Sequence, residues 1–449
     1  MDWVSALALM LGMICAFMAL GLPVAFAFLL ANIVGAIIFL GDNGIVPALI
    51  SLVRGSMASI SNFNLAPIPL FLLMGEILLQ TGLAFRAVDA IDRLISRVPG
   101  RLSVVAVTGG TMFSALSGST IATTAMLGQA LLPDMLKRGY HPTMAMGPIM
   151  AIGGVDMLIP PSALTVLLAT LASGASKVKI SVADLLIAGI LPGLIMSALF
   201  LAYIVLRCRA NPALAPAYEV KKFTPRERWL PFLKYVVPLF LIFIVVMGSM
   251  FSGIASPTDA AALGCLATVI LALGYRSLRF TTLIACLKGM AVVTTMIFFI
   301  IAASTSFAQI LAFSGATDGA LAALGNLALG KYAAIFAMIG VLLILGCFMD
   351  QVSMMLLTLP FFMPLANALL GPSSYDHVWL GVILLISLQI GLLTPPFGLL
   401  LFVMKGVAPP EITLRQVWAA ATPFTLIVLA VLLAIVFVPA FATALVRLM

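Results

Sequence analysis

Charged residues are scarce in this chain, where they make up 8% of 449 residues, against roughly 25% in an ordinary soluble domain. Hydrophobic residues make up 63%. A water-soluble fold of this composition could not cover its surface with polar groups, which excludes a soluble enzyme. The high apolar content also excludes intrinsic disorder. The sequence therefore predicts a membrane protein with several crossings, since each crossing helix needs about 20 apolar residues.

Metal-binding and redox motifs are also missing. The five cysteines form no CxxC pair, and the two histidines, His141 and His377, lie in different halves of the chain. The cysteines are interpreted as small packing residues. The formal net charge is +8, but the basic residues lie in short loops, so they indicate membrane orientation and no nucleic-acid partner. The chain begins Met1-Asp2-Trp3 without a basic stretch, so no cleaved signal peptide is expected.

Apolar runs bounded by polar residues predict where the chain enters the membrane. Two charged helical stretches, 44–60 and 84–98, are predicted to lie in the membrane plane. The predicted crossings and hairpins are 4–20, 22–40, 65–83, 102–136, 141–172, 184–206, 232–250, 256–275, 289–314, 331–370, 377–403 and 417–446.

The basic residues predict the orientation of these segments. If both termini are periplasmic, 102–136 and 331–370 must each enter and leave on one side. We therefore predict two re-entrant hairpins, the first cytoplasmic and the second periplasmic. This arrangement places 18 of the 23 lysines and arginines on the cytoplasmic side. Those on the periplasmic side are Arg54, Lys177, Lys179, Lys331 and Arg447.

The two halves of the chain repeat one order of predicted elements in opposite orientation. Residues 1–206 give two crossings, an interfacial stretch, a crossing, a hairpin, a broken crossing and a last crossing. Residues 232–449 repeat that order, after a basic cytoplasmic linker at 207–231. The predicted fold is an all-α polytopic membrane protein with an inverted repeat, two re-entrant hairpins and two broken helices.

Each half contains a glycine-bearing stretch that runs into Pro-Pro within an apolar span. These stretches are GGVDMLIPPS at 153–162 and GLLTPPFG at 391–398. Proline removes a backbone donor and clashes with the preceding turn, so both helices should unwind there. One such break could be a simple kink, but paired breaks in inverted halves favour a transporter binding site.

The predicted hairpin tips are polar. The first tip, SALSGSTIATT at 114–124, gathers hydroxyls and glycine, and the second, GCFMDQVS at 346–353, adds an acid and an amide. Such tips offer oxygens to a hard cation and helix N-termini to an anion, although small polar residues also suit ordinary turns.

Three acids, Glu76, Asp156 and Asp350, lie deep in apolar stretches, and no capping role is predicted for them. An acid at mid-membrane costs about 2.5–3.5 kcal/mol, so these residues are functional candidates. For Glu76, a structural bond to a neighbouring helix is the alternative interpretation. Asp259 and Asp184, by contrast, follow Ser256 and Ser181 at the spacing of helix caps.

The chain resembles the large membrane subunit of tripartite ATP-independent periplasmic (TRAP) transporters, a DctM-like family of the ion transporter superfamily. Asp259 departs from the glutamate expected of the family, which is a conservative change. The stretches that carry the resemblance, in the order expected of the family, are PIPLFLLMGEIL (67–78), LSGSTIATTAMLG (116–128), LLPDMLKRGYHPTMAMGPIMAIGGVDMLIPPS (131–162), ASPTDAAALG (255–264), GCFMD (346–350) and IGLLTPPFGLLLFV (390–403).

The resemblance implies sodium-coupled uptake of an organic acid, such as a C4-dicarboxylate or sialic acid, delivered by a periplasmic binding protein. It implies a separate small four-helix membrane subunit and a location in the bacterial inner membrane. It also implies an elevator mechanism, in which 102–172 and 331–403 move against a scaffold that includes 84–98 and 276–288.

The resemblance further implies where ions and substrate bind. The implied sodium ligands are Ser117, Gly118, Ser119, Gly153, Gly154, Gly346, Asp350, Gly391 and Thr394. The candidate substrate contacts are Ser119, Thr120, Asp156, Pro160, Ser162, Asp350 and Pro395.

Three other functions compete with this interpretation. A stand-alone sodium- or proton-coupled dicarboxylate or citrate carrier of the same fold would take up substrate without a binding protein. An intramembrane enzyme is disfavoured because the sequence has no HExxH, no GxSxG and no intramembrane His-Asp-Ser set. A passive channel is disfavoured because paired broken helices are a carrier feature.

Overall fold

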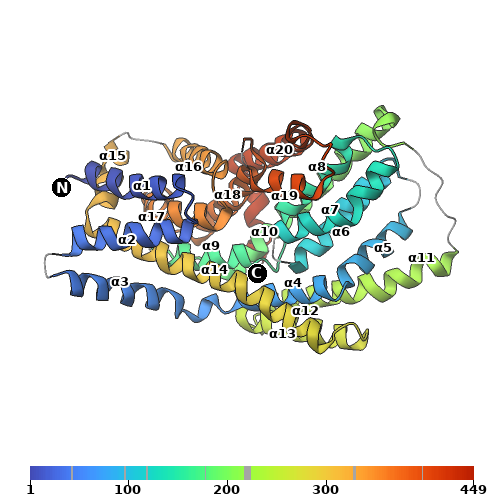
Figure 1. Cartoon of the computed structure of the whole chain (residues 1–449), viewed down its shortest axis with the longest axis horizontal. Helices are drawn as coiled ribbons and strands as arrows, with labels where there is room; N and C mark the ends of the chain where they lie inside the picture. The colour runs from blue at the N-terminus through green and yellow to red at the C-terminus, as the bar shows by residue number, and fades with distance from the viewer. Residues whose placement is uncertain are drawn as a thin grey trace.

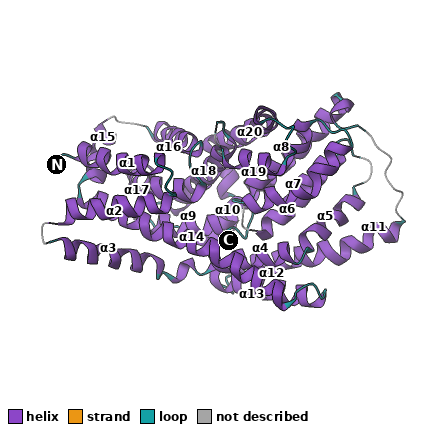
Figure 2. Cartoon of the chain, in the orientation of Figure 1, coloured by secondary structure: helices purple, strands orange, loops and turns teal. Residues whose placement is uncertain are grey.

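The computed structural model describes residues 1–41, 44–95, 98–117, 120–176, 178–216, 224–326, 330–396 and 398–448. All regular secondary structure in these ranges is helical, as the composition predicts (Figure 2). The helices of the first half are α1 (Trp3–Ala19), α2 (Val24–Leu40), α3 (Ile45–Ile60), α4 (Pro67–Gln80), α5 (Leu83–Leu94), α6 (Arg101–Ser117), α7 (Thr120–Lys137), α8 (Pro142–Val155), α9 (Ala163–Ala175) and α10 (Val182–Ala210).

The second half begins within the predicted linker. Short 3-10 turns, η2 (Phe63–Leu65), η3 (Pro212–Leu214) and η5 (Val446–Leu448), and one π-helical turn, η4 (Phe232–Val236), accompany the helices. The helices of the second half are α11 (Pro225–Pro231), α12 (Val237–Phe251), α13 (Pro257–Gly274), α14 (Phe280–Phe313), α15 (Ala316–Asn326), α16 (Lys331–Gly346), α17 (Gln351–Leu370), α18 (Ser374–Leu393), α19 (Leu399–Val407), α20 (Leu414–Phe437) and α21 (Ala440–Thr443).

Both predicted hairpins are pairs of helices, and both predicted broken crossings are interrupted near their Pro-Pro pairs. The hairpins are α6–α7 and α16–α17, and the broken crossings are α8–α9 and α18–α19. These elements bring the polar stretches of the sequence toward the interior.

One local prediction is wrong, and two helices lie in segments to which no helix was assigned. The separate interfacial stretch 276–288 and the crossing 289–314 form one continuous helix, α14, because the exposed Lys288 and the adjacent Gly289 do not interrupt it. Residues 316–326 form the helix α15, which the sequence analysis did not assign. The linker contains α11, which begins with a capping box formed by Thr224 and Glu227.

The structure confirms the predicted helix caps. Ser256 accepts a hydrogen bond from the backbone N–H of Asp259 (3.3 Å), and the Asp259 carboxylate accepts one from the backbone N–H of Ser256 (3.2 Å). Together these bonds satisfy two of the free N–H groups at the start of α13. The hydroxyl of Ser181 accepts from the backbone N–H of Asp184 (3.3 Å) at the start of α10.

Within the described residues, eight helical stretches are long and apolar enough to cross a membrane. Their burial inside the protein differs widely: the most apolar window is 94% buried in Ser374–Leu393 but only 22% buried in Phe280–Phe313. The first stretch therefore lies in the protein interior, and the second presents a largely apolar surface to its surroundings. Non-helical backbone at membrane depth is tolerated when protein encloses it, so the interior position of α18 suits a broken helix.

The two halves of the chain exchange packing partners (Figure 1). Helix α8 packs along α20, and α10 packs along α18, so each broken helix contacts the last long helix of the other half. The contact between α8 and α20 is close at Gly147, where an added Cβ would lie 2.5 Å from the carbonyl oxygen of Ala420 and from the ring of Phe424. This reciprocal arrangement agrees with the predicted inverted repeat.

Candidate functional site

The first interruption is a buried loop between α8 and α9. Asp156, at the C-cap of α8, and Ser162, at the N-cap of α9, each have an exposed fraction of 1%. The Ser162 hydroxyl caps α9 by accepting a hydrogen bond from the backbone N–H of Thr165 (3.4 Å). The peptide bond between Pro160 and Pro161 is cis. Helix α10 closes over this loop, because a Cβ on Gly189 would overlap the carbonyl oxygen of Leu158.

The second interruption has the same construction. The peptide bond between Pro395 and Pro396 is cis, and the loop joins α18 to α19. The hydroxyl of Thr394 donates to the carbonyl oxygen of Ile390 (2.7 Å), which holds the side chain against the last turn of α18. The thiol of Cys347, from the tip of the second hairpin, donates to the carbonyl oxygen of Pro395 (3.3 Å). The second hairpin tip therefore contacts the second interruption directly.

Two glycines make this contact close. A Cβ on Gly346, the last residue of α16, would overlap the Cα of Gly391 in α18 and lie 2.8 Å from its carbonyl carbon. A Cβ on Gly391 would lie 2.9 Å from the Cα of Gly346. Both neighbours are backbone atoms that cannot rotate away, so only glycine fits both positions. Two predicted sodium-site residues are thus in backbone contact.

Asp350 has a structural role that the sequence analysis did not assign. Its side chain caps α17 by accepting from the backbone N–H groups of Val352 (2.9 Å) and Ser353 (3.3 Å), and the Ser353 hydroxyl donates to its other oxygen. The prediction that this acid has no capping role is therefore wrong, because a helix begins within the hairpin tip at Gln351. The carboxylate is held at the tip, where its charge faces the positive end of the α17 dipole.

The two hairpin tips meet in the interior of the protein. The amide nitrogen of Gln351, at the start of α17, donates to the hydroxyl of Thr120, the first residue of α7 (2.9 Å), and both side chains are buried. Gly118 and Ser119 lie outside the described residues, as does the side chain of Ser117. Sequence reasoning placed Gln351 only among the polar residues of the second tip, because its bond to Thr120 is a contact between distant segments.

The first hairpin also packs tightly on the first interruption. A Cβ on Gly153 of α8 would overlap the hydroxyl oxygen of Thr124 and lie 3.3 Å from the carbonyl oxygen of Thr120. A Cβ on the next residue, Gly154, would lie 2.5 Å from Cγ of Gln389 in α18. Gln389 and Thr124 are fully buried, and their polar side-chain atoms have no hydrogen-bond partner among the residues that the structure describes. Thr124 is one of the hydroxyls of the predicted first tip, whereas sequence reasoning missed Gln389, and both add polar groups beside the interruption.

The described residues of this site contain acids but no bases. Asp156 and Asp350 supply the carboxylates, and hydroxyls, amides and backbone groups supply the rest. Such a set offers oxygen ligands to a hard cation. A substrate anion would need a cation or helix N-termini to meet its charge.

The family model for the DctM component of tripartite ATP-independent periplasmic transporters matches residues 11–441. The chain belongs to this family. It is a TRAP large permease and a membrane protein with several spans, as the sequence resemblance predicts. TRAP transporters are tripartite by description, and the permease is one of their components.

Curated relatives of this TRAP permease are named for several substrates. The C4-dicarboxylate permease DctM of Pseudomonas aeruginosa is 32% identical over 86% of each chain. The 2,3-diketo-L-gulonate permease YiaN of Escherichia coli is 31% identical over 97% of each chain. The ectoine permease TeaC of Halomonas elongata is 30% identical over 84% of this chain and 85% of its own. All are transport proteins, so the permease is a transporter subunit and no enzyme.

Solved structures share the fold of the permease at low sequence identity. The Alcanivorax borkumensis YdaH transporter superposes with a TM-score of 0.61, at 15% identity and over 88% of each chain. Neisseria gonorrhoeae MtrF superposes with a TM-score of 0.55, also at 15% identity, over 88% of this chain and 84% of its own. Both likenesses concern the fold alone.

Glu76 of the permease lies on α4, beside the first hairpin near its tip. Its carboxyl group rests on α14, where a Cβ on Gly289 would lie 2.8 Å from the carboxyl carbon. A cavity of about 30 Å³ beside it is also lined by Phe113 of α6 and Ala122 of α7. The side-chain amide of Gln80 donates a hydrogen bond of 3.4 Å to the Glu76 carboxylate. Glu76 thus faces the first hairpin from α4.

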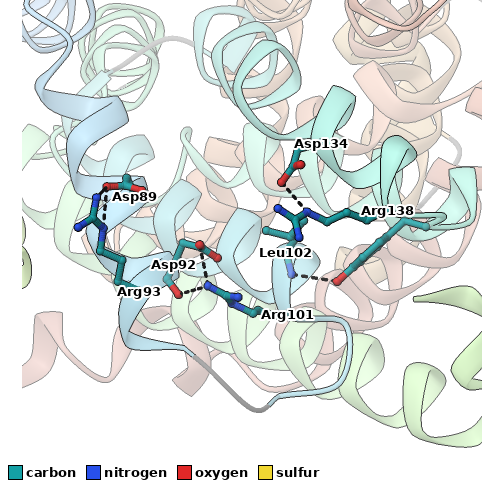
Figure 3. Close-up of polar contacts among 8 residues, drawn as sticks. Asp89, Asp92, Arg93, Arg101, Leu102, Asp134 and Arg138 are labelled. Atoms are coloured by element: carbon teal, nitrogen blue, oxygen red, sulfur yellow. Dashed lines mark hydrogen bonds and ion pairs between the residues drawn. The ribbon is translucent and has the colours of Figure 1, made fainter. Parts of the chain in front are cut away.

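The base of the first hairpin of the permease is held by a buried ion pair (Figure 3). The Arg101 guanidinium donates hydrogen bonds to the carboxylate and to the backbone carbonyl of Asp92, each 2.7 Å long. The Arg101 side chain is 8% exposed. Burial raises the pKa of the Asp92 carboxyl above its usual value, and the nearby Arg101 opposes that rise. The backbone N–H of Leu102 donates to the Tyr140 hydroxyl (3.3 Å). These bonds tie α6 to α5 and to Tyr140, in the turn between α7 and α8.

Proposed function

We propose that this chain is the large permease subunit of a TRAP transporter that couples sodium entry to the uptake of an organic acid. A periplasmic binding protein delivers the acid, and a small four-helix subunit completes the membrane part. The complex lies in the bacterial inner membrane, with both termini of this chain in the periplasm. Relatives named for different substrates are similar to this chain at nearly the same identity, 32% for a C4-dicarboxylate permease and 28% for an ectoine/5-hydroxyectoine permease, so identity does not select one acid.

One observation carries this proposal: both hairpin tips and both interruptions converge in the interior. Gln351 joins the tips through Thr120, and Gly346 joins the second tip to the second interruption through Gly391. Paired interruptions in the two halves of a transporter are where substrate and coupling ions bind.

The residues at this convergence suit sodium. At the second interruption, Gly346, Gly391, Asp350 and Thr394 would hold the ion, and the close approach of the two glycines leaves no side chain between the two backbones. At the first interruption, Gly153 and Gly154 would act with the hairpin residues Ser117, Gly118 and Ser119. Bound sodium would supply the positive charge that the described side chains of the site lack.

The substrate would lie between the same elements. We propose that Thr120, Asp156, Ser162 and Asp350, with Ser119, Pro160 and Pro395, line its site. The caps made by Ser162 and Asp350 fix the starts of α9 and α17, whose N-terminal dipoles favour an anion. Each net positive charge that moves inward gains roughly 2.3 kcal/mol per 100 mV of membrane potential.

The proposed movement is of an elevator type. Residues 102–172 and 331–403 would move as one domain against the remaining helices, with α5 and the start of α14 bracing them. A disulfide or bifunctional cross-link between the first hairpin and α4 should then abolish uptake. Uptake that continues at an unchanged rate after complete cross-linking would contradict this domain assignment.

The coupling is tested in proteoliposomes that contain the whole transporter. Uptake of the acid carried by its binding protein is measured with an inward sodium gradient, with an equal potassium gradient and with a proton gradient. We expect accumulation only with sodium. Accumulation driven by protons alone would refute sodium coupling, and accumulation by this chain without the binding protein would favour a stand-alone carrier.

A further inference from the structure

A cavity beside the second hairpin has a volume of about 460 Å³. Its walls are α17 and α9 on one side, and α14 with the end of α3 on the other. The first two helices belong to the proposed moving domain and the last two to the proposed scaffold. Small-molecule sites typically occupy about 300–1,000 Å³ and favour domain interfaces.

The cavity leads away from the hairpin tips. Leu356 and Pro364 of α17 line it, and they follow Gln351 by a rise of roughly 8 and 20 Å along the helix. Near its inner end, the hydroxyl of Ser304 donates to the carbonyl oxygen of Leu356 (2.8 Å) and joins α14 to α17. By the predicted topology the other end lies toward the periplasm, so the cavity occupies the route by which substrate reaches the tips.

The lining of the cavity is largely apolar, with uncharged polar groups on its scaffold side. None of the described residues that line it is charged, and its scaffold side contributes hydroxyl and amide groups from Ser59, Asn62, Ser304, Thr305, Gln309 and Thr317. Thr305 and Gln309 lie one turn apart on α14. Helix α3 approaches closely at Gly55, where a Cβ would overlap the amide oxygen of Gln309.

This lining discriminates among organic acids. A carboxylate that enters a partly apolar cavity without a countercharge is strongly disfavoured, and a compact dicarboxylate would bring two such charges. A polyhydroxylated monocarboxylate brings one charge and several hydroxyls. A site built to hydrogen-bond hydroxyls rejects analogues that lack them, because its polar groups are then left unpaired.

We propose that this cavity is an entry site for a sugar acid, that is, a polyhydroxylated monocarboxylate. The proposal rests on the proposed function and deepens it by naming the substrate class. The hydroxyls and amides of α14 bind the hydroxyls of the sugar acid, and its carboxylate is the end that continues to the hairpin tips.

The experiment uses cysteine labelling of the full chain in membrane vesicles. The five native cysteines are replaced by serine or alanine, and Thr305→Cys is reacted with a membrane-impermeant methanethiosulfonate from either side. Ser252→Cys, in the exposed turn between α12 and α13, is the control, because the predicted topology places it on the same side but away from the cavity. D-gluconate and succinate are the probes.

We expect both cysteines to react from the periplasmic side. D-gluconate at about ten times its Kd should slow labelling at position 305 about tenfold, since only the empty cavity reacts, and should leave position 252 unaffected. Succinate should protect neither position. An unreactive position 305, or equal protection by succinate, would overturn the proposal.

Uptake assays separate this result from the proposed function. If sodium-driven uptake of succinate is found together with protection by succinate, the proposed function holds and the sugar-acid site is wrong. If position 305 is protected by gluconate but uptake needs no sodium, the entry site holds and the proposed coupling is wrong.

Discussion

Replacing Gly346 by alanine tests whether the backbone contact between the second hairpin and α18 builds a sodium site. The new methyl carbon would overlap the Cα of Gly391 and lie 2.8 Å from its carbonyl carbon. Carbon atoms pack at about 3.5–4.0 Å, so the two backbones must separate by roughly 1 Å. Overpacking of this kind typically costs about 1–3 kcal/mol.

The sodium site should suffer more than the fold. Binding sites must hold their ligands to within about 0.5 Å, so a shift of this size should weaken sodium binding at least tenfold. At a sodium concentration of about 100 times the Kd, the native protein gains about 2.7 kcal/mol of stability, and a site tenfold weaker gains about 1.4 kcal/mol.

The assay is thermal unfolding of the detergent-solubilised protein in sodium chloride and in choline chloride at equal ionic strength. Gly340→Ala is the matched control, because it lies on the same helix and a Cβ there meets no atom within 4 Å. The control should keep the full sodium-dependent rise in Tm, and Gly346→Ala should lose about half of it. Equal sodium-dependent shifts in the two variants would refute the reasoning.

Three further predictions concern single side chains. Asp350→Asn should keep the α17 cap and hence the Tm in choline, because asparagine caps as well as aspartate, but should raise the sodium concentration for half-maximal uptake; unchanged sodium dependence would remove Asp350 from the ligands. Arg101→Ala should destabilise the protein by about 2–4 kcal/mol, against less than about 0.5 kcal/mol for Arg93→Ala in the exposed pair with Asp89. Burial raises the pKa of the Asp92 carboxyl in the folded protein. This carboxyl therefore contributes fully to stability below the pKa that it has in the unfolded chain, and its contribution falls as pH rises through its folded pKa. Removing Arg101 raises the folded pKa of Asp92 further. The loss of unfolding free energy caused by Arg101→Ala, measured from unfolding curves, should therefore grow with pH across the acid range. A loss that does not depend on pH would contradict this. Thr305→Val should raise the KM for gluconate uptake about three- to tenfold with little change in kcat, as expected for one lost hydrogen bond, whereas Thr295→Val, on the exposed face of the same helix, should leave KM unchanged.

Local signals in the sequence predicted the hairpins, the interruptions and the helix caps. Pro160-Pro161 and Pro395-Pro396 break their helices wherever the rest of the chain lies, because proline acts on its own turn. The cap of Ser256 likewise depends on neighbours within four residues. Such features follow from short stretches of sequence.

Contacts between distant segments could not be predicted in the same way. Gln351 and Thr120 belong to opposite halves of the chain, and neither stretch indicates the other. The role of Asp350 was misjudged because the start of α17 inside the tip was not recognised. Helix α14 continues through Lys288 because this side chain is exposed, and the composition of the segment does not reveal that exposure.

The exchange of partners between α8 and α20, and between α10 and α18, has a consequence for how the chain is made. When the first half leaves the ribosome, the face of α8 around Gly147 still lacks Ala420 and Phe424, which cover it in the finished protein. One face of its broken helix, the face that α6 and α7 do not cover, therefore has no protein partner until nearly the last helix has been inserted. The interior of the protein, and any ion site within it, can therefore be completed only near the end of synthesis.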